Sequence, residues 1–266
     1  VLIGGDDNYA IGELRDIYKN WISENKILVT NLWSSELSKL SANAFLAQRI
    51  SSINSISALC EATGAKITEI SNSIGLDKRI GKYFLRSGPG FGGSCFQKDI
   101  LSLVYLCRYY GLNEVADYWE QVIFLNKWQR KRISSLIVDK LFNTVSSKKI
   151  LILGFSYKPN TNDTRESSST YIAKDLLANG AQLLIHDPQV SIQQISNELG
   201  LKEGLSYSKD SEGNWLFCKD ILEQAKNADA IVILTEWQSY KQIKWEYVVS
   251  VMRRPAWIFD TRGVLD

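Results

Sequence analysis

The chain has 266 residues, enough for two domains that each bury a hydrophobic core. Hydrophobic residues make up 45% of the sequence and charged residues 23%, a globular composition that excludes a disordered or fibrous protein. The formal net charge is +2, so no overall field attracts nucleic acid or a membrane surface. No apolar run approaches the roughly 20 residues that span a bilayer, and no signal peptide is recognised. We expect a cytoplasmic protein that binds neither nucleic acid nor membranes.

Four cysteines and one histidine limit the chemistry that the chain carries. The cysteines form no C-x-x-C pair, so neither a disulfide framework nor a zinc site is indicated, and no metal ion is predicted. Cys60, Cys107 and Cys218 lie in apolar patterns and are expected to be small buried residues. The single histidine, His186, is expected to end a strand rather than to act as a catalyst.

Residues 1–31 show a strand, helix, strand pattern. Residues 1–5 are a short apolar run, residues 10–23 have apolar side chains at helical spacing, and residues 27–30 are β-forming. A pair of parallel strands needs neighbours to cover and extend it. We therefore interpret this segment as a β-α-β remnant that cannot form a domain alone.

Residues 32–143 are predicted to form an all-helical central domain. Apolar residues at helical steps continue to the Thr-Gly stop signal at 63–64, and further helices are expected over 67–74 and from about 95 to 110. A fourth helix, over 115–142, is expected to be the longest, with a near-heptad apolar stripe for about eight turns. A helix of that length usually bridges domains or subunits, so we expect this domain to mediate dimerisation.

At Ser146-Ser147-Lys148 the pattern changes to that of a doubly wound parallel α/β domain, Rossmann-like, which we expect to cover residues 144–266. Continuous apolar runs, typical of buried parallel strands, alternate with helical stretches at 167–179 and 219–227. Residues 187–215 are polar and show the least regular pattern. Ligands of such a sheet bind at the carboxyl ends of its strands. The predicted strands are 150–154, 182–186, 230–235 and 256–260.

A glycine-rich loop precedes the third central helix. Its sequence Gly88-Pro-Gly-Phe-Gly-Gly93 matches G-x-G-x-x-G, but a dinucleotide fingerprint joins a strand to a helix, and here a helix leads into another helix. The loop can still donate backbone N–H groups to an anionic or oxygen-rich ligand. We expect Ser94 to be the N-cap, which places Cys95 in the first helical turn, where a thiolate is favoured. Because Asp99 lies one turn further on the same face, Cys95 is the best candidate nucleophile.

The residues around this cysteine resemble a known family. Gly90-Phe-Gly-Gly-Ser-Cys-Phe-Gln-Lys-Asp99 is similar to the active-site signature of the UDP-glucose dehydrogenases, within the wider family of nucleotide-sugar dehydrogenases. Further blocks resemble the same family in the same order, so the resemblance covers essentially the whole chain. These blocks are residues 34–49, 153–158, 163–169 and 235–237.

The resemblance implies an enzyme that oxidises the C6 alcohol of UDP-glucose to a carboxylate, giving UDP-glucuronate, in two hydride transfers to two NAD. Cys95 is implied to add to the intermediate aldehyde as a thiohemiacetal, which a second hydride transfer converts to a thioester that water hydrolyses. Lys39 and Asn43, one helical turn apart, are implied to contact the oxygen that becomes anionic. Asp99 is implied to act as a base through water or to hold Lys39 in place, and both roles stay open.

The resemblance also implies contacts of the central domain with substrate. Phe84, Arg86 and the loop 87–91 line the sugar-nucleotide site in this interpretation, and Arg79 reaches the active site of a neighbouring subunit in a dimer or hexamer. The complete implied substrate set is Lys39, Asn43, Arg79, Phe84, Arg86, Ser87, Gly88, Pro89, Gly90, Phe91, Tyr157, Lys158 and Arg262.

Further contacts are implied for the C-terminal domain. Tyr157 and Lys158 come just after its first strand, where a nucleotide site is expected, and Lys158 is implied to contact substrate. Arg165 is implied to approach NAD, together with Ser94 and Cys95. The resemblance further implies that residues 1–31 are the C-terminal remnant of the family's N-terminal, NAD-binding Rossmann domain. The family's dinucleotide fingerprint and the glutamate that assists thioester hydrolysis belong to the part of that domain outside this sequence, so the chain alone is expected to be inactive.

Three positions depart from the family pattern. Close relatives tend to have Phe at the position of Tyr157, Lys at that of Arg86, and two adjacent arginines where this chain has Arg262 and Gly263. The second of those arginines is a substrate contact in the family. Its replacement by Gly263 leaves Arg262 as the candidate to substitute for it.

Other functions stay open at this point. A sister enzyme would act on GDP-mannose or a UDP-N-acetylhexosamine, although the Phe-Gln-Lys-Asp form after Cys95 and the block at 49–55 favour UDP-glucose. A non-catalytic oligomerisation and nucleotide-binding module would chiefly use the 115–142 stripe, although the joint presence of four catalytic candidates argues against it. A cysteine hydrolase would need His186, which lies in another domain.

Overall fold

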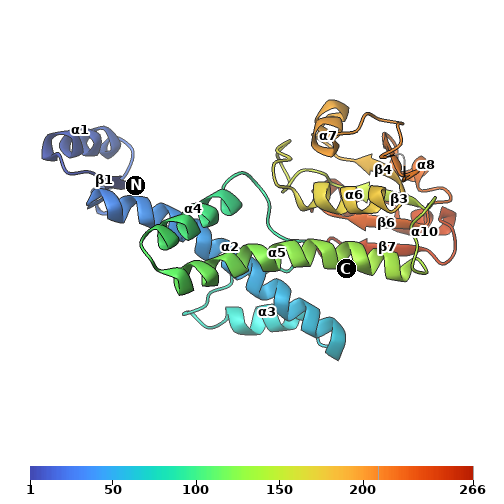
Figure 1. Ribbon diagram of the computed structural model, residues 1–266, viewed down its shortest axis with the longest axis horizontal. Helices are drawn as coiled ribbons and strands as arrows, with labels where there is room; N and C mark the ends of the chain where they lie inside the picture. The colour runs from blue at the N-terminus through green and yellow to red at the C-terminus, as the bar shows by residue number, and fades with distance from the viewer. Residues whose placement is uncertain (209, 266) are drawn as a thin grey trace.

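The computed structural model describes residues 1–208 and 210–265; residue 266, where the third predicted domain ends, lies outside them. Figure 1 shows an elongated chain with a small α/β unit at one end, long helices in the middle and a sheet domain at the other end. The predicted fold class, a Rossmann-like fragment followed by a helical part and a doubly wound α/β part, is confirmed.

The N-terminal unit is a parallel β-α-β fragment. It consists of β1 (Leu2–Gly4), α1 (Asn8–Lys19), a 3-10 turn at Glu24–Lys26 and β2 (Leu28–Thr30). The strands were predicted within two residues, and α1 ends four residues earlier than predicted. Ile3 and Ile27 are buried, whereas every residue of α1 is at least partly exposed. The unit therefore has little core of its own, as expected for two strands that lack neighbours.

Four helices form the middle of the molecule. They are α2 (Leu32–Thr63), α3 (Ile67–Gly75), α4 (Phe96–Tyr109) and α5 (Asn113–Lys140). α2 has 32 residues and α5 has 28, so the expectation that the helix at 115–142 is the longest is wrong. The serine-rich start of α2 lacks apolar periodicity, but Asn31 caps the helix by accepting a hydrogen bond from Ser34 N at 2.8 Å. At its other end Gly64 has φ +78°, a left-handed stop.

α5 contributes to two hydrophobic cores, one among the central helices and one at the C-terminal sheet. Val122 and Ile123 pack with α2 and α4, whereas Ile133 and Ile137 pack with the C-terminal sheet and α6. The buried face of α5 is also partly polar, which the apolar stripe did not predict. The buried polar residues are Asn126, Gln129, Arg130 and Ser134.

The C-terminal sheet has five parallel strands in the order β5-β4-β3-β6-β7. Its strands are β3 (Lys149–Leu153), β4 (Gln182–His186), β5 (Asn214–Phe217), β6 (Ala230–Ile233) and β7 (Trp257–Asp260). Its helices are α6 (Ser168–Ala178), α7 (Ile192–Leu199), α8 (Ile221–Gln224), α9 (Gln238–Lys241) and α10 (Trp245–Val251). The strand order reverses between β3 and β6, which is the point where ligands of such sheets bind.

Successive residues of the central strands point to opposite faces of the sheet, and each face has its own hydrophobic core. Ile150 and Ile152 face α5, α6 and α7, whereas Leu151 and Leu153 face the side of α9 and α10. This arrangement explains the continuous apolar runs, because both faces of the central strands are covered. Among the described helices, none combines the length and apolarity needed to cross a membrane.

The polar stretch at 187–215 contains two elements that were not predicted. α7 begins with a capping box formed by Ser191 and Gln194, and β5 is a four-residue edge strand whose Trp215 is buried. An edge strand this short gives almost no apolar pattern. α8 is shorter than the helix predicted at 219–227.

Candidate functional site

Cys95 lies at the start of α4, where its backbone carbonyl accepts a hydrogen bond from Asp99 N at 2.8 Å. Cys95 itself occupies the N-cap position, so the expectation that Ser94 caps the helix is wrong. Helical bonding starts at Cys95, and the Ser94 hydroxyl instead lies 3.6 Å from the Cys95 sulfur. The thiol is exposed, while the other three cysteines are buried and free, as predicted. An exposed thiol at a helix N-terminus is accessible to a ligand that binds there.

The crossing of α2 and α4 brings Lys39, Asn43 and Asp99 together. Asn43 Nδ2 donates to Asp99 Oδ2 at 2.5 Å, and Lys39 Nζ lies 3.8 Å from the same oxygen. The Asp99 side chain is only 10% exposed, whereas that of Lys39 is 67% exposed. The buried carboxylate is thus held by an amide and a cation, and the ammonium group remains accessible to a ligand.

Side chains of α2 and α5 form hydrogen bonds to the backbone of the glycine-rich loop and hold it in place. Gly88 N donates to Asn54 Oδ1 at 2.8 Å, and Gly88 O accepts from Gln129 Nε2 at 2.9 Å. Asn126 makes two hydrogen bonds to the backbone of Phe91, at 2.8 and 3.0 Å. The expectation that the loop offers its N–H groups to a ligand is therefore wrong for Gly88 and Phe91, because buried amide side chains satisfy them.

The same loop touches the C-terminal domain. Gly93 N donates to Arg165 O at 2.9 Å, and the Tyr157 ring packs against Gly93. A Cβ atom on Gly92 would lie 2.5 Å from the carbonyl oxygen of Glu166, so only glycine permits this approach. The contact places the loops that carry Tyr157 and Arg165 beside the start of α4.

Arg165 is an exposed cation whose backbone carbonyl contacts Gly93, two residues before Cys95. Its guanidinium donates to both carboxylate oxygens of Asp163, at 2.9 and 2.7 Å. These hydrogen bonds raise the pKa of Arg165, and the negative charge of a Cys95 thiolate raises it further. In turn, Arg165 lowers the pKa of Asp163. Lys158 is exposed nearby, with its Nζ 5.4 Å from the centre of the Tyr157 ring.

Two arginines meet near the carboxyl ends of β6 and β7. Arg262 Nε donates to Leu234 O at 2.8 Å and lies 3.3 Å from Glu236, and burial lowers the pKa of this guanidinium. Arg86 Nη2 donates to Gly263 O at 2.9 Å and also to the carbonyl of Arg262. Among the described residues, Glu236 is the carboxylate that forms an ion pair with one of these two guanidinium groups.

Two predicted residues stand apart from this cluster. Among the described residues, Arg79 forms hydrogen bonds to Asp77 at distances down to 2.6 Å and none to the Cys95 cluster, and its side chain is 89% exposed. Phe84 is exposed with φ +59°, an unusual left-handed conformation for a bulky residue.

The sequence did not predict the buried polar residues that hold the loops of the site in place. Asn54, Asn126, Gln129 and Arg130 are buried polar residues of α2 and α5 whose only sequence signal is a polar residue on an apolar helical face. Asp187 follows β4 and accepts hydrogen bonds from Phe155 N and Trp237 Nε1, among others, so it ties together the loops after β3, β4 and β6. His186, which ends β4 as predicted, contacts the Tyr240 hydroxyl at 3.0 Å.

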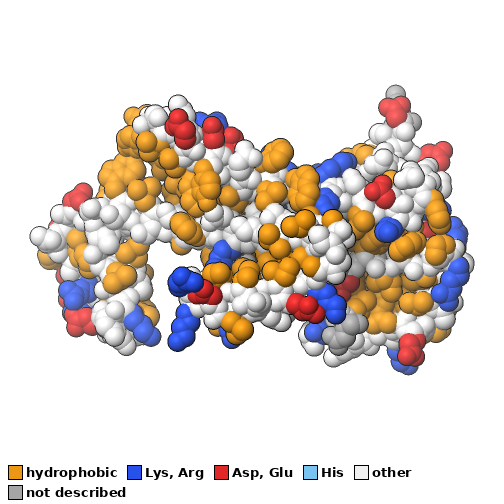
Figure 2. Space-filling model, turned by 90° about the horizontal axis from the view of Figure 1, so that it is seen from below, with side chains coloured by type: hydrophobic (Ala, Val, Ile, Leu, Met, Phe, Trp, Pro, Cys, Tyr) orange, Lys and Arg blue, Asp and Glu red, His pale blue; other side chains and the backbone are white. Residues whose placement is uncertain are grey.

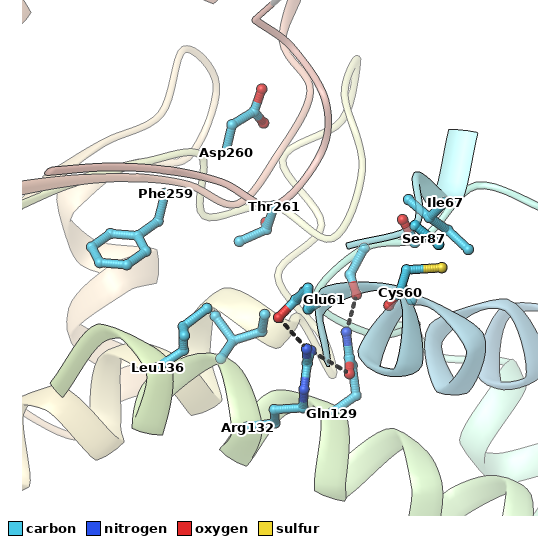
Figure 3. A pocket seen from close by; sticks show the side chains of 14 residues that line it. Cys60, Glu61, Ile67, Ser87, Gln129, Arg132, Leu136, Phe259, Asp260 and Thr261 are labelled. Atoms are coloured by element: carbon cyan, nitrogen blue, oxygen red, sulfur yellow. Dashed lines mark hydrogen bonds and ion pairs between the residues drawn. The ribbon is translucent and has the colours of Figure 1, made fainter. Parts of the chain in front are cut away.

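A cavity of about 340 Å³ lies between α2, α5 and the end of β7 (Figure 3). Arg132 pairs there with Glu61 and contacts Gln129, so these polar groups are already satisfied. Cys60 also lines the cavity and, at 1.5 Å rise per residue, lies roughly 25 Å along α2 from Asn43. Ser87 and Gly88 line the cavity as well, so it extends from this part of α2 to the start of the glycine-rich loop.

The connection from β1 to α1 does not suit a dinucleotide. Asp7 caps α1 by accepting hydrogen bonds from Tyr9 N at 2.8 Å and Ala10 N at 3.3 Å. A carboxylate at this helix N-terminus repels the diphosphate that a dinucleotide would place there.

Comparison with protein families gives two matches. Residues 33–128 match the UDP-glucose/GDP-mannose dehydrogenase family, central domain, and residues 151–266 match the UDP binding domain of the same family.

Individual relatives agree with these matches. UDP-glucose 6-dehydrogenase of Mus musculus is 54% identical over 270 residues, covering 100% of this chain and 55% of the relative. The Caenorhabditis elegans enzyme of that name is 51% identical, covering 100% and 56%. The chain thus spans about half the length of the curated relatives it matches. The structure of a UDP-glucose dehydrogenase from the hyperthermophilic archaeon Pyrobaculum islandicum is similar with a TM-score of 0.82 and 28% identity, over 99% of this chain and 55% of that one.

Proposed function

Because the chain belongs to the UDP-glucose/GDP-mannose dehydrogenase family, we propose that it carries the central and UDP-binding parts of an NAD-dependent UDP-glucose 6-dehydrogenase. The observation that carries the proposal is the cluster of Lys39, Asn43, Cys95 and Asp99, in which an exposed thiol lies on the same helix as a buried carboxylate that a lysine neutralises. The identity to animal UDP-glucose 6-dehydrogenases supports UDP-glucose as the substrate.

The first oxidation needs stabilisation of a developing alkoxide. The exposed ammonium of Lys39 supplies a positive charge for that oxygen, while Asp99 and Asn43 behind it hold the group in place. Asp99 is nearly buried, so it takes up a proton from substrate through water rather than by direct contact. NAD, when bound, supplies the acceptor for both hydrides.

The second oxidation needs the thiol. An aldehyde has no hydroxyl on C6 from which a hydride can be removed, so the Cys95 thiolate adds to C6 and the aldehyde oxygen gains a proton to form a thiohemiacetal. Loss of hydride from C6 and of the hydroxyl proton gives a thioester on Cys95. Water then attacks the thioester, which releases the carboxylate and regenerates the thiol.

The residues near Cys95 fit part of an NAD site. Arg165 presents an exposed guanidinium there and Ser94 a hydroxyl, groups that suit the phosphates and ribose of a dinucleotide. Since the β1–α1 connection does not suit the diphosphate, the described residues provide only one side of that site. We therefore expect the 266-residue chain alone to form no NADH from NAD and UDP-glucose.

The sugar nucleotide is proposed to lie along the glycine-rich loop. Arg86 and Arg262 provide positive charge for its diphosphate at the carboxyl ends of β6 and β7. Tyr157 and Lys158 face the same region from the loop after β3. In this arrangement Arg86 lies against Gly263 and provides the charge that an arginine at that position would bring.

We also propose that the enzyme is a homo-oligomer built from dimers of the central helices. Most of the large apolar side chains that are exposed belong to residues 32–142, and Figure 2 shows such side chains spread over the surface there. A groove between α2 and α4 is lined by Trp33, Leu37 and Tyr110. A second subunit would cover this surface. In this proposal the exposed Arg79, which pairs with Asp77 within its own subunit, reaches the partner's substrate site.

Replacement of Cys95 by serine in the full-length enzyme tests the reaction. We expect Cys95→Ser to lower the rate of UDP-glucuronate formation by roughly 1000-fold or more, since loss of a covalent nucleophile has effects of at least that order. The control is Cys107→Ser, which changes a buried thiol of the same helix. Formation of UDP-glucuronate at the normal rate by Cys95→Ser would refute the covalent mechanism.

A panel of nucleotide sugars tests the substrate. GDP-mannose and UDP-N-acetylhexosamines are substrates of sister enzymes, and a higher kcat/KM for one of them than for UDP-glucose would assign the chain to that group. Absence of turnover with every sugar by the full-length protein would favour a non-catalytic nucleotide-binding module. We place the enzyme in the cytoplasm, because a reducing compartment keeps a thiol such as Cys95 free.

A further inference from the structure

Arg130 of α5 joins the glycine-rich loop to the C-terminal domain. Its side chain is 4% exposed. Nη2 donates to the carbonyl of Phe91 at 2.7 Å and to the carbonyl of Glu166 at 2.8 Å, and Nε donates to Ser168 Oγ at 3.2 Å. One buried guanidinium thus connects α5, the loop before Cys95 and the start of α6.

The surroundings of Arg130 compensate for its burial only in part. Burial lowers the pKa of the guanidinium, while Tyr171 and Glu166 raise it. Glu166 Oε2 lies 3.7 Å from Nη1, and the centre of the Tyr171 ring lies 4.1 Å from Cζ. Among the described residues, Nη1 has no hydrogen-bond partner. Removing the guanidinium alone would take a donor from the carbonyls of Phe91 and Glu166, so Arg130 contributes to stability. A role in positioning the loops therefore needs a readout other than stability.

The segment that receives the guanidinium is strained. Glu166 has φ +53°, a left-handed conformation that is uncommon for residues other than glycine. Its carbonyl accepts from Arg130 and also abuts Gly92, while the neighbouring carbonyl of Arg165 accepts from Gly93 N at 2.9 Å. The two loops therefore touch at successive residues, and each fixes the path of the other.

We propose that Arg130 is a positioning residue that holds the Cys95 thiol beside Arg165 by clamping the two loops that carry them. Phe91 precedes Cys95 by one short loop segment, and Glu166 directly follows Arg165. Because its guanidinium is buried among protein groups, Arg130 acts through these loops and not on the substrate. The inference rests on the proposed role of Cys95 as the nucleophile.

The test compares Arg130→Met and Arg130→Lys in the full-length enzyme. Methionine keeps the apolar stem and removes all donors, whereas lysine keeps the charge but lacks the fork that reaches Phe91, Glu166 and Ser168 together. We expect Arg130→Met to lower kcat roughly 100-fold, with a smaller change in KM, because misplacing a reacting group by about 1 Å has an effect of that size. Arg130→Lys should recover only part of this loss.

The control is Lys131→Met on the same helix. Lys131 is exposed and pairs with Asp175 of α6 at 3.2 Å, so this variant removes a charge between α5 and the C-terminal domain without touching the loops. We expect its kcat to match that of the unaltered enzyme. Thermal unfolding of each variant shows whether it is folded.

Alkylation of Cys95 by iodoacetamide gives a second readout that needs no turnover. The thiol is exposed while the other cysteines are buried, so peptide mass mapping isolates its rate. At fixed pH we expect Arg130→Met to slow this reaction, because the thiolate loses its cationic neighbour. A folded Arg130→Met variant with unchanged kcat and unchanged alkylation would overturn the proposal. So would loss of the fold in both Arg130 variants, which would assign Arg130 to stability.

The Cys95→Ser variant separates this inference from the proposed function. If Cys95→Ser forms UDP-glucuronate at the normal rate, the proposed mechanism is wrong, and Arg130 then has no nucleophile to position. If Cys95→Ser is inactive while Arg130→Met is fully active, only the positioning role is wrong.

Discussion

Asp99 shows how burial and charge combine at a single residue of the site. The carboxylate is nearly buried, and the Asn43 amide at 2.5 Å and the Lys39 ammonium at 3.8 Å compensate for its charge. Removing only the charge leaves Lys39 without its counter-ion and presents an amide to the Asn43 amide. The geometry of the cluster therefore depends on an ionised aspartate.

We expect Asp99→Asn in the full-length enzyme to reduce kcat by about 100-fold, the lower end of the effect of a lost acid–base group. Steady-state formation of NADH measures it. Asp117→Asn is the control, since Asp117 is an exposed carboxylate that pairs with Arg108 at 3.5 Å. Equal kcat values for the two variants would mean that Asp99 has no part in the reaction.

His186 makes stability depend on pH. Burial lowers its pKa below the ordinary 6.5, although the neighbouring Asp187 opposes this effect. Between the folded and unfolded pKa values the unfolded chain binds more protons, so the free energy of unfolding decreases as pH falls below about 6.5. Urea unfolding at about pH 7.5 and about pH 5.5 measures this change.

A His186→Gln variant should lose that part of the pH dependence. Since His186 is the chain's single histidine, selective isotope labelling also gives its pKa directly by NMR. A pKa above 6.5 in the folded chain would contradict the prediction.

At the scale of elements, the ends of strands are built around glycines that permit close approach. Gly154 follows β3 with φ +93°, and a Cβ atom there would lie 2.4 Å from the Cβ of Thr235 after β6. Thr235 in turn donates to Ser156 O at 2.6 Å. The two loops at the point where the strand order reverses are therefore packed directly on each other.

We expect Gly154→Ala to destabilise the protein by about 2–4 kcal/mol, from overpacking together with a left-handed backbone. The control is Gly12→Ala, for which we expect the protein to become more stable. A Cβ atom at Gly12 would meet nothing within 4 Å, and alanine stabilises a helix by about 0.5–1 kcal/mol relative to glycine. Denaturant unfolding of both variants gives the two free energies. A neutral Gly154→Ala would show that the loop relaxes.

For the whole molecule, the central helices leave more apolar surface exposed than the sheet domain does. Trp33 and Tyr110 pack edge to face at the groove between α2 and α4, and both remain half exposed. We expect Tyr110→Lys to weaken dimerisation at least tenfold, since burying an unpaired charge in an apolar interface costs more than about 1.4 kcal/mol.

Light scattering after size exclusion measures the association. The control is Tyr247→Lys, which adds the same charge on α10 of the sheet domain. If both variants remain as associated as the unaltered protein, the groove between α2 and α4 is not the dimer interface.

The sequence by itself determined the elements whose side chains have a strong apolar period, and the local pairs on one helix. The central strands β3, β4 and β6 were predicted because both of their faces are buried, which makes the residues in the middle of each strand apolar. Helical spacing placed Lys39 and Asn43 one turn apart on α2, and Cys95 and Asp99 one turn apart at the start of α4. The family motif around Cys95 was also readable directly from the sequence.

Only the tertiary structure decided which of these pairs meet and what holds them. The crossing of α2 and α4 places Lys39 beside Asp99, residues far apart in sequence, and no local period encodes that crossing. Arg130 lies on an apolar helical face, and the local sequence does not explain a charged residue there. The explanation is tertiary, because its guanidinium donates to the carbonyls of Phe91 and Glu166. The physical reason is that a buried polar group is specified by its partners, and those partners come from other segments of the chain.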